Sequence, residues 1–247
     1  MQVNRDLLEE VSAVLCAADW DVALLQECPP RWSGPLAVRC LAAGHRVLTS
    51  RNSLAPLRSV VARANPDLIA SNEGGSNLTL IRLEAARIVA RRLLVLRRGP
   101  RPERRVMAFT RIAVAGGEAE ISVANLHASA GRARAWLAEE EVLLAAERAV
   151  GWSQGTPLIL GGDLNLRPGD SEIYGELSRR HGLTGPTAPS ALDHLLARGL
   201  DAVDPPRAWI PERREVRREG LAIRLSDHAP VEAAFALPLP AGSQRRR

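Results

Sequence analysis

Apolar runs that end in polar residues recur along this chain of 247 residues. Pro157-Leu158-Ile159-Leu160 has the composition of a buried strand, and Gly162-Asp163-Leu164-Asn165 follows it almost directly. Because residues i and i+2 of a strand point to the same side, we expect Asp163 and Asn165 to emerge together at the strand's end. The alternative is an ordinary Gly-Asp turn that contains Asn, since these residues are common turn formers.

Four more segments repeat this pattern of a polar residue inside or at the end of an apolar run. They are Val22–Glu27, which ends in a carboxylate; Ile121–His127, which ends in a histidine; Leu192–Leu196, which contains Asp193; and Leu225–Val231, which contains Asp227 and His228. A polar group in an apolar strand is costly unless it has a partner. We therefore expect these residues to be partners of one another at one site.

The spacing of apolar positions also predicts the remaining elements. Helices are expected at 5–18 with Asn4 as N-cap, at 29–43, at 54–64, and at 132–150, where Trp136, Leu137, Leu143 and Leu144 are available to the core. Strands are expected at 21–27, 78–83, 88–96, 105–114, 120–126, 158–160, 192–196 and 231–237, with turns at 98–102 and 116–117 and a further hairpin near 208–224. Many strands in hairpins with helices between them indicate an α+β fold in which two sheets pack together under helices.

Size and composition fit one domain over residues 1–240, followed by a disordered Arg-rich tail over 241–247. The chain is 46% hydrophobic, enough for a full core, and it has no run of 18 or more apolar residues, so no membrane span is expected. The N-terminus lacks the pattern of a signal peptide. The three cysteines, Cys16, Cys28 and Cys40, have no metal-binding spacing. We interpret them as thiols in a reducing cytoplasm.

The charge balance is positive, with a net charge of +5, and all 33 basic residues are Arg. Arg binds phosphate through two hydrogen bonds at once, so a polyanionic partner such as a nucleic acid would favour it. A GC-rich genome would enrich Arg as well, and it better explains the absence of Lys. The Arg clusters at 97–105 and 213–218 are candidates for following a phosphate backbone, although solvated hairpin tips are the commoner explanation.

The ordered set of motifs resembles the endonuclease/exonuclease/phosphatase superfamily of metal-dependent phosphoesterases. The resemblance spans residues 5–237 and rests on Leu25-Gln26-Glu27, the strand that ends at His127, Gly162-Asp163-Leu164-Asn165, Asp193, and Ser226-Asp227-His228. It implies a four-layer α/β/β/α sandwich of two packed, mainly antiparallel sheets flanked by helices. It also implies a phosphodiester substrate, with a nucleic acid as the leading class. A lipid or small-molecule phosphate ester and a non-catalytic binding domain are the alternatives.

The resemblance assigns a role to each of these residues. Glu27 and Asp227 would hold Mg²⁺, or Mn²⁺ in its place. Asp163 would position and deprotonate the attacking water, while Asn165 and His127 would donate to phosphate oxygens. His228 would contact the phosphate or assist proton transfer, with Asp193 holding its ring. Two alternatives stay open: His127 capping a turn with Ser129, and Asp193 pairing with an Arg.

One departure from the family pattern concerns the start of the chain. Members of the family usually begin with a strand whose Asn helps to position the metal, and no such strand precedes the first expected helix. Asn4 is interpreted as a helix cap and not as this ligand. We therefore expect weaker metal positioning. Among the other polar residues, His194 is expected in the core, His45 and His181 in solvent, Asn77 at a loop end, and Asn125 as a brace or a structural hydrogen-bond partner.

Overall fold

The protein is described by a computed structural model that covers residues 6–49, 75–98, 104–116, 119–218 and 220–237. Its first half contains α1 (Leu8–Ala17), β1 (Val22–Cys28), α2 (Ser33–Arg39), β2 (Ala42–Leu48), β3 (Ser76–Arg82), β4 (Ala86–Arg98), β5 (Arg104–Val114) and β6 (Glu120–His127). Its second half contains α4 (Ala135–Ser153), β7 (Leu158–Asp163), α5 (Ile173–His181), β8 (Asp193–Arg198), β9 (Asp201–Ala208), β10 (Glu215–Arg218), β11 (Leu221–Arg224) and β12 (Val231–Ala236). Single 3-10 turns occupy Pro30–Trp32, Arg132–Arg134 and Pro211–Arg214.

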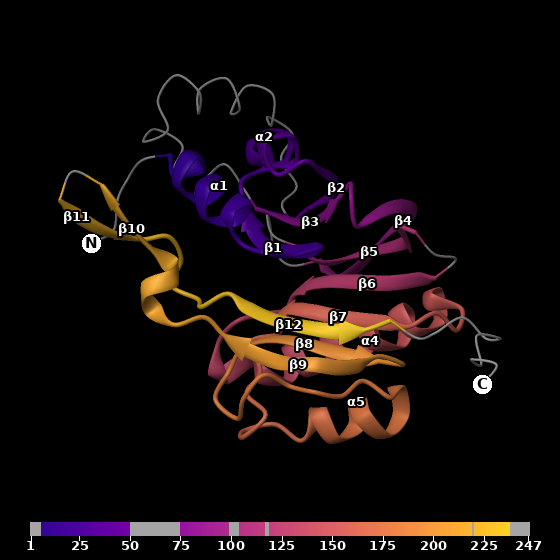
Figure 1. Ribbon diagram of the computed structural model, residues 1–247. Helices are drawn as coiled ribbons and strands as arrows, with labels where there is room; N and C mark the ends of the chain where they lie inside the picture. The colour runs from indigo at the N-terminus through magenta and orange to yellow at the C-terminus, as the bar shows by residue number, and fades with distance from the viewer. Residues whose placement is uncertain (1–5, 50–74, 99–103, 117–118, 219, 238–247) are drawn as a thin grey trace.

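The elements form four layers (Figure 1). A three-stranded sheet in the order β1-β3-β2 lies beneath α1 and α2, and a five-stranded sheet in the order β4-β5-β6-β7-β8 packs against α4 and α5. All neighbours in the two sheets are antiparallel except β6 and β7, which α4 connects. Two further pairs are β9 with β12, which both contact β8, and β10 with β11, which projects away from the sheets on the side of α1 (Figure 1). The expected α+β sandwich of two sheets flanked by helices is confirmed.

Apolar side chains fill the helix-facing sides of both sheets. The larger core joins α4 and α5 to the five-stranded sheet and includes Phe109, Leu126, Val142, Leu160 and Leu177. The smaller core joins α1 and α2 to the three-stranded sheet through Leu36, Leu78 and Leu80. Burial of these side chains holds the helices in place, since each contributes roughly 1.5–3 kcal/mol relative to exposure.

The interface between the two sheets also contains buried polar contacts. The Asn77 amide donates to the carbonyl of Val106 at 2.9 Å, and His45 Nδ1 lies 2.8 Å from Thr110 Oγ1. Burial, followed by the charge of Arg91, lowers the pKa of His45 to about 4. The expectations of a solvated His45 and a loop-end Asn77 are therefore wrong, because β2 and β3 direct both side chains towards the other sheet.

Several element boundaries differ from the sequence expectation. The first helix begins at Leu8, whose backbone N–H bonds the Asp6 carboxylate at 3.2 Å, while the expected cap Asn4 lies outside the described residues. The second helix ends at Arg39, because Leu41 adopts φ 50° and residues 42–48 pair with β3 as a strand. The apolar pattern also gave no indication of α5 and β9. The expected helix 54–64, parts of the turns at 98–102 and 116–117, the domain boundary at 240 and the tail 241–247 lie outside the described ranges.

The long helix α4 faces the core through small side chains. Ala138, Ala145, Ala146 and Ala149 are buried along it, whereas Trp136 is 57% exposed. The expectation that Trp136 reaches the core is wrong. Trp136 lies on an outer face of α4, where the Arg97 guanidinium of β4 is 5.9 Å from the centre of its ring.

The cysteines differ from the expectation of three thiols. Cys16 in α1 and Cys40 directly after α2 form a disulfide with a Cα–Cα distance of 5.0 Å, and Cys28 is a buried thiol that takes no part in this bond. That expectation is therefore wrong for two of the three, since packing of the two helices on one sheet brings their sulfur atoms together. None of the helices in the described ranges is long and apolar enough to cross a membrane.

Candidate active site

Strand register brings three predicted site residues to one edge of the five-stranded sheet. His127 is paired with Asp163 across β6 and β7, and Asp163 is paired with Asp193 across β7 and β8. Paired residues on neighbouring strands have adjacent side chains. The polar residues at the ends of these apolar runs therefore meet because the strands pair in this register.

Gly162 makes the approach of β6 and β7 possible at this edge. It adopts φ 128°, and a Cβ atom at this position would overlap the carbonyl oxygen of Leu126 and lie 3.0 Å from Gln26 Nε2. Only glycine reaches such a conformation without strain. The side chain next to it, Asp163, is thereby held beside His127, with Oδ2 3.6 Å from His127 Nε2.

His228 joins the edge from the segment before β12. Its Nδ1 lies 2.7 Å from Asp193 Oδ2 and 4.0 Å from Asp163 Oδ2. Burial acts to lower the pKa of His228, but the carboxylates of Asp193, Asp163 and Asp227 outweigh it and raise the pKa. Within the described ranges Asp193 thus pairs with His228 and with no Arg, and the imidazole is set to carry a proton.

Burial shifts the pKa values of Asp163 and His127, the two groups at the centre of the edge, in directions that suit acid–base chemistry. It raises the pKa of Asp163 to about 6, with the Asp193 charge adding to the effect. It lowers the pKa of His127 to about 4, assisted by the positive charges of Arg105 and His228. At neutral pH His127 is therefore a neutral donor and acceptor, and Asp163 is a carboxylate close to its titration point.

Asn165 is locked to this edge by its own backbone and side chain. Its N–H donates to Asp163 Oδ1 at 3.0 Å, and its amide Nδ2 donates to the carbonyl of Ala128 at 3.1 Å. The residue adopts φ 53°, a left-handed conformation that Asn tolerates better than most residues. One amide hydrogen bonds the Ala128 carbonyl, and the other has no acceptor among the described residues, which leaves it open to a ligand.

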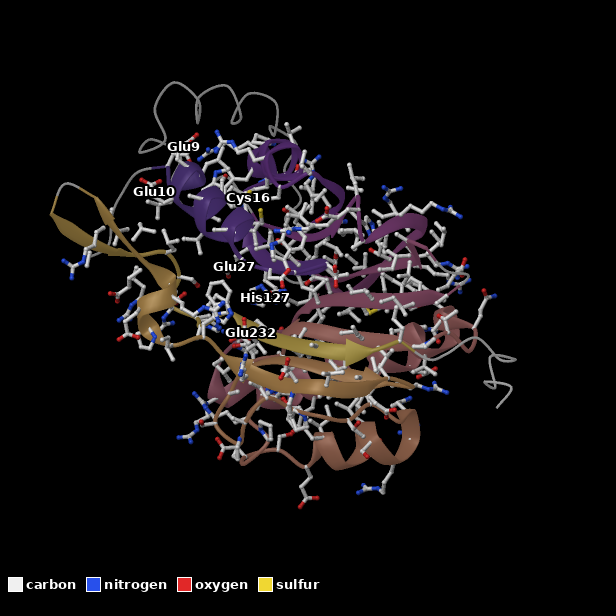
Figure 2. All side chains as sticks on the ribbon, viewed as in Figure 1. Glu9, Glu10, Cys16, Glu27, His127 and Glu232 are labelled. Carbon is white, nitrogen blue, oxygen red and sulfur yellow. A yellow bond between two sulfur atoms is a disulfide. The ribbon has the colours of Figure 1, made fainter. Side chains whose placement is uncertain are left out.

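Glu27 approaches the same edge from the other sheet. Its carboxylate Oε1 lies 4.0 Å from His127 Nδ1, and its side chain is 80% exposed. Figure 2 shows the labelled side chains of Glu27 and His127 close to one another. An irregularity in pairing between Leu25 and Cys28, with Glu27 at φ 52°, ends the regular strand here. The preceding residue turns inward, so that Gln26 Nε2 donates to Asn125 Oδ1 at 2.8 Å.

This Gln26–Asn125 contact joins the two sheets behind the site. Asn125 is fully buried and also donates to the carbonyls of Leu78 and Leu25 at 3.2 and 3.3 Å. Sequence reasoning left the role of Asn125 open between a brace and a structural partner, and it assigned no role to Gln26. The signal for Gln26 was its place next to Glu27, which directs it to the opposite side of the strand.

The chemistry of the donor set fits a divalent cation. Among the described residues, Asp163, Asp193 and His228 each offer a ligand atom, and these atoms lie within 4.8 Å of one another. Carboxylate oxygens are the ligands that hard cations such as Mg²⁺ prefer. Glu27 and Asp227, the predicted metal ligands, are not part of this group. Asp227 is exposed, and its backbone carbonyl accepts from Arg214 at 3.2 Å.

The remaining histidine alternatives are resolved by their contacts. Ser129 bonds through its N–H and hydroxyl to Glu141, at 2.7 and 2.8 Å, so it is engaged away from His127. His194 is buried, accepts from the Thr187 N–H at 3.1 Å and has Nε2 3.2 Å from the Leu166 carbonyl, as expected for a core residue. His181 at the end of α5 is partly exposed.

Solved structures with the same architecture come from several organisms. The human Nocturnin catalytic domain with bound sulfate superimposes with a TM-score of 0.67 at 16% identity, covering 94% of this chain and 85% of that one. A Bacteroides thetaiotaomicron mannosyl-6-phosphatase gives 0.67 at 15% identity, with 93% and 90% covered. Truncated Caenorhabditis elegans TDP2 gives 0.61 at 15% identity, with 92% and 89% covered. At these identities the likeness establishes the fold.

The sequence itself identifies the family. No curated protein matches the chain significantly. The family model described as Endonuclease/Exonuclease/phosphatase family matches residues 2–228, which include every residue gathered at the edge described above. The chain belongs to the endonuclease/exonuclease/phosphatase family.

Proposed function

We propose that this protein is a Mg²⁺-dependent phosphodiester hydrolase of the nuclease type. The observation that carries the proposal is the joining of two acid–base pairs at one sheet edge. Asp163 lies 3.6 Å from His127, and Asp193 lies 2.7 Å from His228. Burial and neighbouring charges separate the pKa values of these groups, an arrangement typical of residues with distinct acid and base roles.

In the proposed mechanism each side chain has one task. Asp163 accepts the proton of the attacking water, a role suited to a carboxylate whose pKa is raised to about 6. Asn165 and neutral His127 donate hydrogen bonds to phosphate oxygens, where negative charge accumulates. His228, charged and oriented by Asp193, contacts the phosphate or protonates the leaving oxygen.

The cation completes the proposed site. The carboxylates of Asp163 and Asp193 lie close enough together to approach it, and Glu27 supplies a third carboxylate from the other sheet, while charged His228 stays outside the ligand set as a proton donor. Asp227 would join them by turning its exposed side chain towards the edge. Bound Mg²⁺, or Mn²⁺ in its place, would neutralise charge on the phosphate and lower the pKa of a coordinated water.

Cleavage of supercoiled plasmid with Mg²⁺ tests this function. The wild-type chain should nick the plasmid, while EDTA or Asp163→Asn should abolish nicking. Asp170→Asn is the matched control, since Asp170 is an exposed aspartate in the loop that follows Asn165, and it should cut like the wild type. A plasmid that stays intact with the wild-type protein, or cleavage that survives Asp163→Asn, would argue against a nuclease.

Two other classes of function are the alternatives, and the Asp163→Asn variant distinguishes them. A lipid or small-molecule phosphoesterase would leave plasmid intact and hydrolyse a small ester with the same dependence on Asp163; the structural neighbour named as a mannosyl-6-phosphatase is one reason to include a monoester. A non-catalytic binding domain would bind its ligand equally well after Asp163→Asn. The cytoplasmic location stays a prediction, and the Cys16–Cys40 disulfide weighs against it because such bonds persist in oxidising compartments.

A further inference from the structure

A buried carboxylate on α4 stands out among the groups that the proposed mechanism does not use. Glu141 is 2% exposed, although its neighbours Glu139 and Glu140 are more accessible. Its Oε2 accepts from the Ser129 N–H at 2.7 Å, and its Oε1 accepts from the Ser129 hydroxyl at 2.8 Å and from Arg97 Nε at 2.9 Å. A buried carboxylate with this set of donors is well satisfied, because each bond offsets its loss of hydration.

The carboxylate holds the segment that leads away from the active-site edge. Ser129 follows His127 by two residues, and the intervening Ala128 makes two bonds to the site. Its N–H donates to the carbonyl of Asp163 at 2.9 Å, and its own carbonyl accepts from Asn165 Nδ2 at 3.1 Å. A continuous path therefore runs from Glu141 through Ser129 and Ala128 to the amide of Asn165.

Stability alone is a weak reason for such a buried charge. Replacing a buried ion pair by well-packed apolar side chains is often neutral or stabilising. Asn165, in contrast, gains a defined orientation from this path. Its backbone is already in a left-handed conformation, and its amide would turn freely without the Ala128 carbonyl to fix one hydrogen.

We propose that Glu141 is a positioning residue for Asn165, holding Ser129 and Ala128 so that the Asn165 amide points its remaining N–H towards the substrate phosphate. This inference rests on the phosphoesterase function proposed above. It goes beyond that function by assigning a mechanistic part to an α4 residue that does not touch the substrate.

A double-mutant cycle measures this coupling in the full-length chain. Glu141→Ala should lower kcat about 10- to 100-fold with KM changed less than about threefold, because a misplaced donor weakens mainly the transition state. In an Asn165→Ala background the same change should lower kcat less than about threefold, since the donor is already gone. If Glu141→Ala lowers kcat by the same factor in the wild-type and Asn165→Ala backgrounds, or lowers it in neither, the proposal is overturned.

Matched variants separate positioning from folding. Glu140→Gln removes an exposed carboxylate that bonds the same Arg97 at 2.8 Å, and it should keep wild-type kcat. Glu141→Gln keeps one acceptor for Ser129 and should give an intermediate kcat. Ser129→Ala removes the hydroxyl bond only, and it tests the same path if Glu141→Ala fails to fold. If Glu140→Gln lowers kcat as much as Glu141→Ala does, the effect comes from the Arg97 contact that both glutamates share, and the proposal is refuted.

A readout without turnover keeps the inference distinct from the proposed function. The side-chain amide signals of Asn165, assigned by their loss in Asn165→Ala, should shift or broaden in Glu141→Ala, while those of buried Asn125 stay unchanged. If the wild type hydrolyses no ester but this shift occurs, the proposed function fails and the positioning stands. An unchanged Asn165 amide, or equal changes at both residues, overturns the positioning whether or not the protein is an enzyme.

Discussion

Replacing Gly162 by alanine tests how closely β6 and β7 must approach to form the candidate site. Gly162 has φ 128°, a conformation that costs an L-residue about 1–3 kcal/mol. The new Cβ would also meet the Leu126 carbonyl, with its carbon 3.1 Å away, and Gln26 Nε2 at 3.0 Å. Backbone atoms cannot turn aside as side chains do, so an overpacking cost of about 1–3 kcal/mol adds to the strain. We expect a total loss of about 2–6 kcal/mol.

Urea unfolding at constant pH measures this loss as a lower midpoint with an unchanged m-value. Gly185→Ala is the matched control, because Gly185 has φ 83° and a Cβ there would meet nothing within 4 Å. It carries the conformational cost alone, about 1–2 kcal/mol. If Gly162→Ala lowers the midpoint no more than Gly185→Ala does, the close approach of the strands is not what requires glycine at this position.

Three further predictions concern charge and metal. Asp163→Asn should stabilise the metal-free protein by up to about 2–3 kcal/mol at pH 7.5, because folding raises the pKa of Asp163 from 3.8 to about 6 and the ionised form therefore opposes folding. The advantage should vanish below pH 4 in thermal melts with EDTA; an equal gain at all pH values would contradict it. His45 should change stability with pH in the opposite direction, because folding lowers its pKa from 6.5 to about 4. The free energy of unfolding should therefore drop by up to about 3 kcal/mol as pH falls from 6.5 to 4. His45→Asn should flatten this part of the urea-derived profile, and an unchanged slope would refute the assignment. Glu27→Gln should raise the Mg²⁺ concentration for half-maximal activity at least about tenfold, whereas an unchanged metal titration would remove Glu27 from the metal site.

The sequence predicted the gathering of these polar side chains better than it predicted some of the elements around them. Asp163, Asp193, His127 and His228 could be found because each is a polar residue at the end of, or beside, an apolar run, where an unpaired group would be costly. Their meeting depends on the register of β6, β7 and β8, which the order of the motifs indicated only through the resemblance.

Features that depend on tertiary contacts were not predicted. The strand β2 was not predicted, and the expected helix 29–43 overlaps its first two residues. Gly44-His45-Arg46 lacks an alternating apolar pattern, and the strand forms through its pairing with β3. The Cys16–Cys40 disulfide requires two helices to pack on one sheet, which spacing along the chain does not reveal. Glu141 stands in a run of three glutamates, a pattern typical of a solvated helix face.

The most direct measurement is the initial rate of bis(p-nitrophenyl) phosphate hydrolysis with Mg²⁺ and with Mn²⁺. This diester contains no base, lipid or sugar, so it reports on the chemistry of the edge formed by His127, Asp163, Asp193 and His228. We expect metal-dependent turnover that EDTA abolishes and that Asp163→Asn lowers at least about a hundredfold. Absence of turnover with either metal, or a rate that Asp163→Asn leaves unchanged, would contradict the assignment of this edge as a phosphodiesterase active site.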